Sequence, residues 1–383
     1  MKILQLHSEY STSKISGENS TVNNLHKIFS SFSSAELYRV STASLHNNLF
    51  ARYSALEKYL FSDQHVLELS KDFDFILLHN PIPLVSAQTI RKMSSNSQIV
   101  RVWHNFRNSC ISGSHFRNGS DCFECRDKLT GRLAGVVHRC YRDSIVQSSV
   151  VSFAESRLGK LYRDREIFHV GISEFMCNYI ESLGIDRSRI QHIPNAVIGM
   201  DFTALPQGDD LLMMGRIEPE KGFVKFLEAW NSLSASLKRG RTLHIVGEGS
   251  QSNVVSKFAS IGDIEVHGVL SPPEISKLAS YCGTGVACSI WDEPFGKIAA
   301  EYQAMGLKTL VTPRGGLMEV AKSSPGGLVT KDTSVESISR SLVEILNQNF
   351  VSRHEIFDAY QKNYSVESIA NRWKVFFGEL KIE

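Results

Sequence analysis

Residues 288–306 read CSIWDEPFGKIAAEYQAMG. This stretch is typical of a buried strand, over 285–290, that runs through a tight proline- and glycine-containing turn into a helix beginning near Phe295. Two glutamates, Glu293 and Glu301, lie on either side of the helix start. A helical rise of about 1.5 Å per residue separates them by roughly 12 Å, so this segment could contact a ligand at two distant points.

A nucleotide diphosphate-sugar suits this spacing, because it carries hydroxyl-rich rings at both ends and a dianionic bridge between them. Glu293 could accept hydrogen bonds from the sugar, and Glu301 from the ribose. The free backbone amides of Phe295, Gly296 and Lys297 would face the diphosphate, since a helix N-terminus favours anions. The alternative is an ordinary surface helix with two solvated glutamates.

Length and composition indicate a soluble globular protein of two domains. The chain has 383 residues, of which 42% are hydrophobic and 21% charged, too many residues for one compact core. No apolar run is long enough for a spanning helix. Residues 1–7 lack the apolar segment of a signal peptide and are expected to form a first core strand, which makes the cytoplasm the expected compartment.

The net charge is +2, and it is unevenly distributed. Residues 1–175 contain 21 Lys and Arg against 16 Asp and Glu, a net of +5, which leaves −3 for the remainder. A mildly basic first half favours an anionic partner, either a phosphate-bearing acceptor or a membrane surface. A solvated basic face is the alternative.

Short apolar runs alternate with helix-like spacing along the whole chain. Helices are expected over 20–31, 54–69, 222–237 and from 174 to 182, with helical spacing again after 335. Strands are expected over 3–6, 73–79, 99–103, 166–172, 190–193, 211–214, 242–246, 264–269, 285–290 and 308–311. The alternation predicts an α/β protein with two Rossmann-like doubly wound domains facing each other across a cleft. In such sheets ligands bind beyond the carboxyl ends of the strands.

Two cations follow the first strand of the second half, in the segment GRIEPEKG at 215–222. Arg216 would bind a diphosphate as a planar fork and Lys221 as a point charge. A lysine at a helix start opposes the helix dipole, so a bound anion explains its position better than coincidence does.

Two glycine-containing turns and one histidine are weaker candidates. Gly247 follows the strand at 242–246 and could allow a close approach to a phosphate, although a plain strand-to-helix turn explains it equally well. Gly17 precedes the first helix and could present backbone amides, or simply belong to an N-cap. His104 ends a buried strand at the cleft side of the first domain, a position that favours function over a structural role.

Four cysteines fall within one loop-rich segment: Cys110, Cys122, Cys125 and Cys140. Four thiolates at this spacing could hold a tetrahedral structural zinc, with His115 and His138 as alternative ligands. Disulfides are disfavoured in a cytoplasmic protein. The other interpretation is a set of reduced thiols in a mobile loop.

Three segments resemble the retaining family 4 glycosyltransferases of the GT-B fold: GRIEPEKG at 215–222, EPFGKIAAE at 293–301 and GGLMEV at 315–320. SEF at 173–175 and IPN at 193–195 match the end of the family's first domain, so the resemblance covers essentially the whole chain. HNF at 104–106, the cysteine-rich loop and HRCY at 138–141 are similar to a subgroup of bacterial capsule, O-antigen and exopolysaccharide transferases.

The resemblance implies a domain organisation and a site. Residues 1–196 would bind the acceptor, 197–208 would form a linker and 209–363 would bind the nucleotide-sugar, with a helix over 364–383 packing back on the first domain. No metal would be needed for catalysis, because two cations would take the place of Mg²⁺. The implied catalytic residues are His104, Glu293, Arg216 and Lys221, and the donor set is Gly17, Gly215, Arg216, Lys221, Gly247, Glu293, Phe295, Gly296, Lys297 and Glu301.

Two departures from the family pattern affect these expectations. The glycine pair expected near the N-terminus is Ser16-Gly17 here, which puts phosphate binding by that loop in doubt. The Pro-Asn-Gly turn is Pro194-Asn195-Ala196, which restricts the turn but keeps the asparagine.

The sequence therefore predicts a metal-independent retaining hexosyltransferase of bacterial surface polysaccharide or lipopolysaccharide synthesis. Its donor would be a UDP-, GDP- or dTDP-sugar, and its acceptor a glycan or a lipid-linked glycan, reached from the cytoplasm or peripherally at the inner face of the plasma membrane. The alternatives are a GT-B epimerase or phosphorylase, and a zinc-stabilised binding module without enzymatic activity. Nucleic-acid binding is not expected, because the net charge is close to zero.

Overall fold

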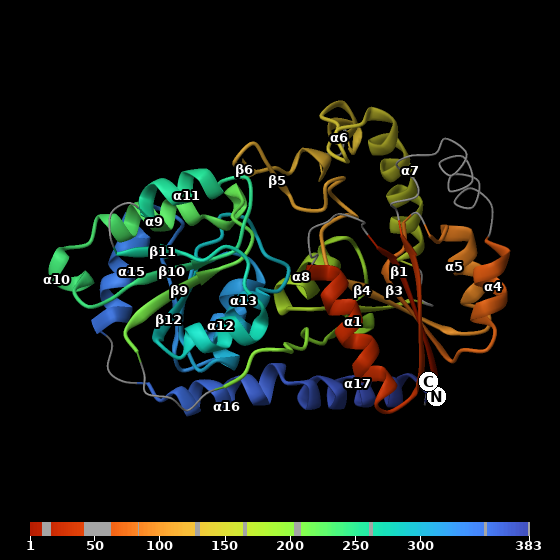
Figure 1. The fold of residues 1–383 in the computed structure, drawn as a ribbon. Helices are drawn as coiled ribbons and strands as arrows, with labels where there is room; N and C mark the ends of the chain where they lie inside the picture. The colour runs from red at the N-terminus through yellow and green to blue at the C-terminus, as the bar shows by residue number, and fades with distance from the viewer. Residues whose placement is uncertain are drawn as a thin grey trace. The chain divides into compact units, whose positions relative to one another are not determined.

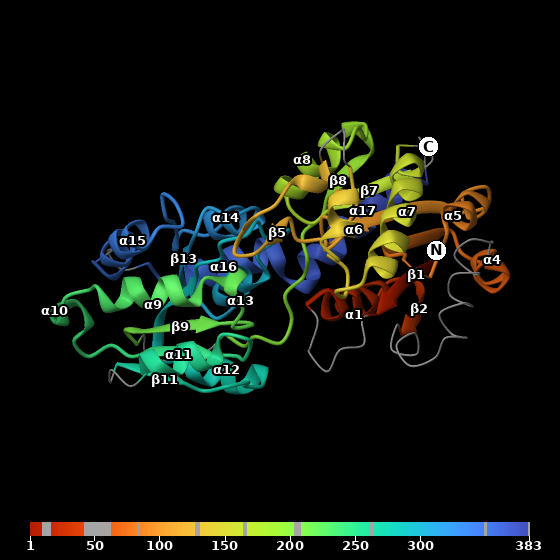
Figure 2. The same cartoon turned by 90° about the horizontal axis from the view of Figure 1, so that it is seen from above.

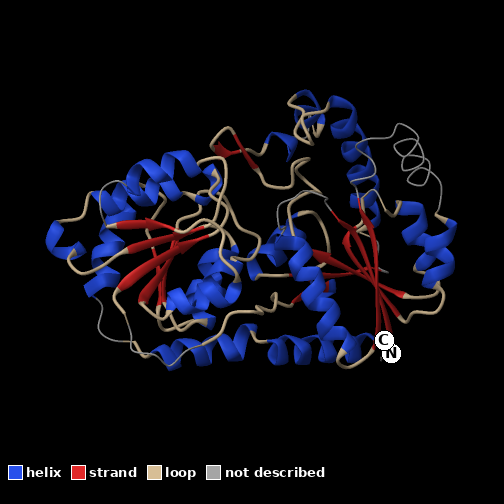
Figure 3. Ribbon diagram, in the orientation of Figure 1, coloured by secondary structure: helices blue, strands red, loops and turns tan. Residues whose placement is uncertain are grey.

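The computed structural model describes residues 1–9, 17–41, 63–82, 84–126, 131–163, 167–202, 208–259, 263–347 and 351–381. The chain forms two compact units (Figure 1). Unit 1 comprises Met1–His115, Cys122–Ala196 and Ala370–Glu383, and unit 2 comprises Phe116–Asp121 and Val197–Ile369. Each unit contains a twisted sheet covered by helices (Figure 3).

The sheet of unit 1 has six strands in the order β2-β1-β3-β4-β7-β8, all parallel. Its strands β1 and β3 are buried along nearly their whole length, as expected for a parallel sheet covered on both faces. The strand order reverses between β1 and β3, so their carboxyl ends flank the switch point where such folds bind ligands. The strands are β1 (Lys2–Glu9), β2 (Ser34–Ser41), β3 (Phe75–Asn80), β4 (Gln98–Trp103), β7 (Ile167–Gly171) and β8 (Ile190–His192).

Four of the described helices of unit 1 begin at a capping side chain that accepts a backbone N–H bond. These caps are Asp63, Ser86, Ser144 and Ser173. A short hairpin of β5 (Phe116–Arg117) and β6 (Ser120–Asp121) interrupts the unit. The helices are α1 (Gly17–Ser30), α4 (Gln64–Ser70), α5 (Ala87–Met93), α6 (Leu133–Val137), α7 (Ile145–Leu161) and α8 (Glu174–Ser182).

The last helix, α17 (Val366–Leu380), contributes aromatic side chains to the core of unit 1. The ring of Trp373 lies edge-on to Phe29 with the centroids 5.1 Å apart, and Phe377 lies 4.6 Å from Phe75. Aromatic pairs at this separation add stability beyond the area that they bury. Unit 1 is therefore assembled from segments near both ends of the sequence.

Unit 2 contains a second parallel six-stranded sheet, in the order β11-β10-β9-β12-β13-β14. In sequence order this is third, second, first, fourth, fifth and sixth, the doubly wound order of dinucleotide-binding domains, with its switch point between β9 and β12. The strands are β9 (Asp210–Met214), β10 (Leu243–Val246), β11 (Ile264–Val266), β12 (Cys282–Ala287), β13 (Lys308–Val311) and β14 (Gly327–Val329).

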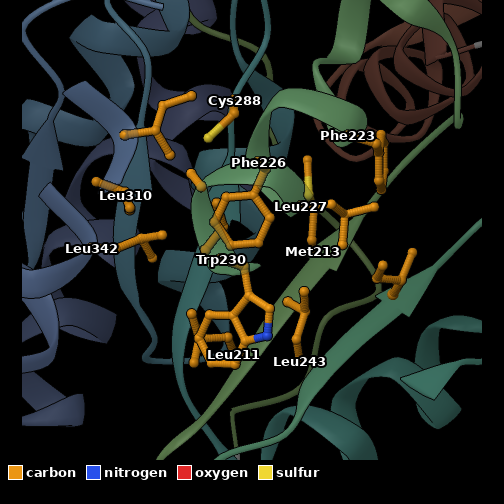
Figure 4. Packing of buried hydrophobic residues seen from close by; sticks show 14 of the residues in the cluster. Leu211, Met213, Phe223, Phe226, Leu227, Trp230, Leu243, Cys288, Leu310 and Leu342 are labelled. Atoms are coloured by element: carbon orange, nitrogen blue, oxygen red, sulfur yellow. The ribbon is translucent and has the colours of Figure 1, made fainter. Parts of the chain in front are cut away.

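Helices cover both faces of this sheet (Figure 2). On one face Phe226 and Trp230 pack against strand residues such as Leu211 in a continuous apolar cluster (Figure 4). On the other face a side chain at Gly285 would overlap the ring of Tyr302, so α13 lies directly against β12. The helices are α9 (Phe223–Asn231), α10 (Ala235–Lys238), α11 (Ser252–Ala259), α12 (Pro272–Ala279), α13 (Lys297–Ala304), α14 (Gly316–Lys322), α15 (Val335–Asn347) and α16 (Arg353–Tyr364).

Several predicted elements differ from the observed ones. The helix expected over 222–237 is two helices, because the chain turns at Ser232–Ser234 between α9 and α10. The strand expected over 285–290 is β12, which ends at Ala287, and the helix expected from Phe295 begins at Lys297. Parts of the predicted helix at 54–69 and of the linker at 197–208 lie outside the described residues.

No helix in the described part of the chain is long and apolar enough to cross a membrane.

Candidate functional site

The carboxyl-end edge of the sheet in unit 2 consists of loops held together by backbone hydrogen bonds. The loop after β9 meets the loop after β10, where the N–H of Ile217 donates to the carbonyl of Glu248 at 2.9 Å. It also meets the loop after β12, because Ile290 donates to the carbonyl of Glu220 at 2.9 Å. These contacts join both sides of the switch point between β9 and β12.

Two glycines permit this close packing. Gly222 has a φ of +71°, and a side chain there would overlap the carbonyl oxygen of Cys288. Gly296 has a φ of +94°, and its side chain would overlap the backbone of Leu317. A glycine adopts such conformations at little cost, so both positions require one.

A partly buried ion pair lies within these loops. Lys221 Nζ is 2.8 Å from Glu293 Oε1, and the hydroxyl of Ser289 donates to the same carboxylate oxygen. The Ser289 carbonyl in turn accepts a hydrogen bond of 2.6 Å from the hydroxyl of Thr312. The ammonium group of Lys221 also lies 5.5 Å from the ring centre of Trp291, a cation–π contact. Glu293 is only 6% exposed, so the protein itself fixes the carboxylate's orientation.

The other predicted charges of unit 2 have different partners. Arg216 pairs with Glu220 at 3.0 Å rather than with Glu293, and its side chain is half exposed. Lys297 pairs with Glu301 at 2.9 Å across one turn of α13. Of the predicted charges, the structure thus brings Lys221 and Glu293 together. Arg216 pairs with Glu220, and Lys297 pairs with Glu301.

The predicted glycines of unit 2 lie at the same edge, while Phe295 is a core residue. Gly215 donates to the carbonyl of Val246 at 3.0 Å and Gly247 to that of Gly268 at 2.7 Å. A side chain at Gly215 would meet nothing within 4 Å, so the backbone there is open to a ligand. The ring of Phe295 is buried 5.7 Å from that of Tyr364.

In unit 1, the predicted residue His104 belongs to a buried chain of hydrogen bonds. His104 Nε2 is 2.9 Å from Nδ1 of His79, and Nε2 of His79 is 3.0 Å from the amide nitrogen of Gln5. An amide nitrogen only donates, so His79 accepts from Gln5 and donates to His104. In this arrangement neutral His104 carries its proton on Nδ1.

Burial keeps the two histidines of this chain neutral. It lowers the pKa of both His79 and His104 well below the usual value, and nearby positive charge adds to the effect. Glu18, in the first turn of α1, accepts a bond of 3.1 Å from the amide of Asn105, and burial raises the pKa of its carboxyl group. Gly17 is exposed at the start of α1, and a side chain there would meet nothing within 4 Å.

The four cysteines of the predicted zinc loop are free thiols. Cys110 is buried and accepts from the backbone N–H of His115 at 3.4 Å, whereas Cys122, Cys125 and Cys140 are partly exposed. Across the described residues, three metal-ligating atoms lie within 4.8 Å of one another at a different place, His244, Glu265 and His267. Zinc binding by the cysteine loop stays a prediction.

Sequence reasoning missed the residues that support the predicted ones. Ser289 and Thr312 orient Glu293, and His79 and Gln5 orient His104. The positions of Ser289, Thr312 and His79 at the carboxyl ends of expected strands were a usable signal, whereas Gln5 lies within its strand. Nothing in the pattern showed which side chains would meet.

Comparisons with known proteins agree with this architecture. Residues 203–364 match the family model of glycosyl transferases group 1. The chain is 24% identical over 267 residues to an uncharacterized glycosyltransferase of Methanocaldococcus jannaschii, MJ1069, across 62% of this chain and 63% of the relative. It is 26% identical over 184 residues to the lipopolysaccharide 1,2-N-acetylglucosaminetransferase of Salmonella typhimurium, across 43% of this chain and 46% of the relative. The chain thus spans less than two thirds of the length of these curated relatives.

Solved glycosyltransferase structures share the fold. Anabaena Alr3699/HepE in complex with UDP and glucose has 12% identity and a TM-score of 0.64, covering 99% of this chain and 100% of its own. Sucrose-phosphate synthase from Thermosynechococcus elongatus has 13% identity and a TM-score of 0.69, covering 100% of this chain and 99% of its own. The predicted GT-B fold is confirmed.

Proposed function

We propose that this chain is a metal-independent retaining glycosyltransferase that moves a sugar from a nucleotide diphosphate donor to a glycan or lipid-linked acceptor. The observation that carries the proposal is the partly buried Lys221–Glu293 pair, which lies beside the switch point of unit 2. The match of residues 203–364 to a glycosyl transferase family supports it. The complex of HepE with UDP and glucose supports a nucleotide-sugar donor.

Each residue of the site has a role in this proposal. Glu293, held by Ser289 and Lys221, accepts hydrogen bonds from the donor sugar, and Glu301 accepts from the ribose. Lys221 and Arg216 balance the charge that develops on the departing diphosphate, which is the part a metal ion plays in other transferases. The open backbone at Gly215 lets the diphosphate approach the loop closely. In unit 1, His104 acts as a hydrogen-bond donor through Nδ1.

The reaction balances without a cofactor. The bond between the anomeric carbon and the diphosphate oxygen breaks, and the acceptor oxygen forms the new glycosidic bond on the same face of the sugar. The acceptor proton passes to an oxygen of the departing diphosphate. The nucleoside diphosphate therefore leaves with the electron pair and the proton, and the configuration at the anomeric carbon is retained.

We further propose that unit 1 contacts an anionic membrane that carries the acceptor. Apolar side chains are exposed on α6 and on the first turn of α7: Leu133 at 61%, Val137 at 65%, Ile145 at 51% and Val146 at 72%. The segment between these helices holds the exposed Arg139. Apolar insertion combined with basic charge is how peripheral proteins bind anionic lipid surfaces.

Removing the central ion pair tests the catalytic proposal. Lys221→Ala and Glu293→Ala should each lower kcat/KM by about 10²- to 10³-fold, because charge stabilisation in such sites has this magnitude. Donor turnover with UDP-, GDP- and dTDP-sugars would be followed by release of the nucleoside diphosphate, with and without EDTA. The matched control is Arg340→Ala with Glu336→Ala, which removes an exposed ion pair on α15.

Wild-type rates in the Lys221 or Glu293 variants would contradict the assigned roles. Turnover that requires inorganic phosphate would identify a phosphorylase, and turnover abolished by EDTA would contradict metal independence.

Vesicle sedimentation tests the membrane proposal. Vesicles of phosphatidylcholine with phosphatidylglycerol should sediment the wild type, and Val137→Ser with Val146→Ser should lose most of this binding. Val375→Ser is the control, because Val375 is 61% exposed on α17. Equal binding by all three proteins would refute a role for α6 and α7.

A further inference from the structure

We propose that His244, Glu265 and His267 form a metal-binding site at the edge of the sheet in unit 2, suited to Zn²⁺ or a similar divalent transition ion. The three side chains offer two imidazole nitrogens and one carboxylate oxygen, all within 4.8 Å of one another. This combination is one of the usual ligand sets of zinc sites that keep one coordination position for water. The site is separate from the proposed donor site and does not depend on it.

The sheet itself brings these residues together. His244 on β10 is the register partner of Glu265 on the edge strand β11, so the two side chains emerge on the same face. His267 follows two residues after Glu265 and therefore returns to that face, and its N–H continues the ladder by donating to the carbonyl of Ile245 at 2.9 Å. Two neighbouring strands thus fix all three ligands.

The distances between the ligand atoms suit a tetrahedral ion. His244 Nδ1 lies 3.0 Å from His267 Nε2 and 3.4 Å from Glu265 Oε2, and the last two atoms are 3.7 Å apart. Bonds of the usual length for zinc place two tetrahedral ligand atoms about 3.3 Å apart. Only small side-chain movements are needed to bind an ion among the three atoms.

A fourth residue prepares His244 for this role. Nε2 of His244 lies 3.3 Å from Oδ2 of Asp210 on β9. A carboxylate at this position holds the proton on Nε2, so that the lone pair of Nδ1 points toward Glu265 and His267. Metal-binding histidines commonly have such a carboxylate partner.

The three ligands differ in exposure, so that one is fixed by burial and another leaves the site open to an ion from solvent. The side chain of His244 is 8% exposed, that of His267 is 25% exposed and that of Glu265 is 61% exposed. A bound ion would link the edge strand β11 to β10. It would also steady Gly268, whose carbonyl accepts from Gly247 in the loop after β10.

Titration of the full chain with Co²⁺, and with Zn²⁺ against a chromophoric chelator, tests the site. Co²⁺ should bind at one equivalent outside the cysteine loop and show the visible bands of tetrahedral coordination without thiolate charge-transfer bands. His244→Gln with His267→Gln should remove this equivalent, and Asp210→Asn should weaken it by about 10- to 100-fold. Asp210→Asn keeps the Oδ1 that caps the N–H of Thr242 at 2.7 Å, so the fold is preserved.

Matched variants separate this site from the cysteine loop. Cys122→Ser with Cys125→Ser should leave the His-bound equivalent intact, as should the control His354→Gln. Glu265→Gln changes an exposed edge residue without threatening the fold and should lower the affinity at least tenfold. Two outcomes would overturn the proposal. One is metal binding that shows thiolate bands and persists in the His244→Gln with His267→Gln variant and in Glu265→Gln. The other is no metal binding at all, in which case the three side chains form only a hydrogen-bonded network.

Discussion

Both units have a group of polar side chains on or after strands near their switch points, but the two groups are held in opposite ways. Unit 2 has a charged pair, Lys221 and Glu293, within loops in backbone contact. Unit 1 has a chain of neutral groups from Gln5 through His79 to His104. Unit 2 therefore balances charge with its ion pair, whereas unit 1 offers an oriented hydrogen-bond donor at His104.

The largest expected difference between the two units is the loss of stability at acidic pH. Burial lowers the pKa of His79 and His104 well below the usual value, and that of His169 to about 3. The unfolded chain binds these protons with a pKa near 6.5, so their contribution to stability is complete above pH 6.5 and is lost as the pH falls. At about 1.4 kcal/mol per proton and pH unit, unit 1 should lose at most about 4 kcal/mol between pH 6.5 and 5.5.

Hydrogen exchange followed by mass spectrometry measures this difference, because it reports on peptides of each unit separately. Burial also lowers the pKa of His267 in unit 2, where the group is only partly buried, so a smaller decline is expected there. Equal loss of protection in both units, after correction for intrinsic exchange, would contradict the distinction.

A pair of glycine substitutions tests the backbone contacts of unit 2. Gly222→Ala should destabilise the protein by about 3 kcal/mol, because alanine there combines an unfavourable φ with an overlap on the Cys288 carbonyl. Gly17→Ala should be neutral within about 0.5 kcal/mol, since its surroundings are open. Urea unfolding measures both, and comparable effects at the two positions would show that the loops of unit 2 are not held by close packing.

The smallest expected effect concerns the orientation of His104. His79→Phe removes the hydrogen bond to His104 while filling a similar volume, and should lower kcat/KM by up to about tenfold, the value of one hydrogen bond. Nitrogen NMR of labelled histidine would show whether the Nδ1 proton of His104 is retained. Gln5→Met is the milder companion variant, because it acts through His79. An unchanged tautomer together with an unchanged rate would remove His79 from the functional site.

The parts of unit 2 that could be predicted from sequence are those with chemical signatures in the residues themselves. A lysine at a helix start, glycines at strand ends and two separated glutamates indicated the site. The sequence could not show that Arg216 turns to Glu220 or that Lys297 turns to Glu301. Those choices depend on side-chain rotamers and on neighbours brought close only by the fold.

The sequence predicted the edge strands β8 and β11, but it did not reveal the other edge strand of each sheet, for a physical reason. Strand β2 carries the polar sequence SAELYRVS and pairs with β1 alone, so it lacks the continuous apolar run of a central strand. Strand β14 has only three residues. In unit 1, the His79–His104 contact joins residues 25 positions apart, and neutral histidines leave no charge pattern that would reveal such a contact.

Unit 1 is made of segments that lie far apart in the sequence, and this determines when it can finish folding during synthesis. Its core includes the contacts of Trp373 with Phe29 and of Phe377 with Phe75. The ribosome must therefore translate all of unit 2 before these contacts can form. Until then the nascent chain exposes an unfilled apolar surface that chaperones can bind. A frameshift between codons 370 and 373 would therefore remove part of the core of unit 1, which is translated first, and leave the residues of unit 2 unchanged.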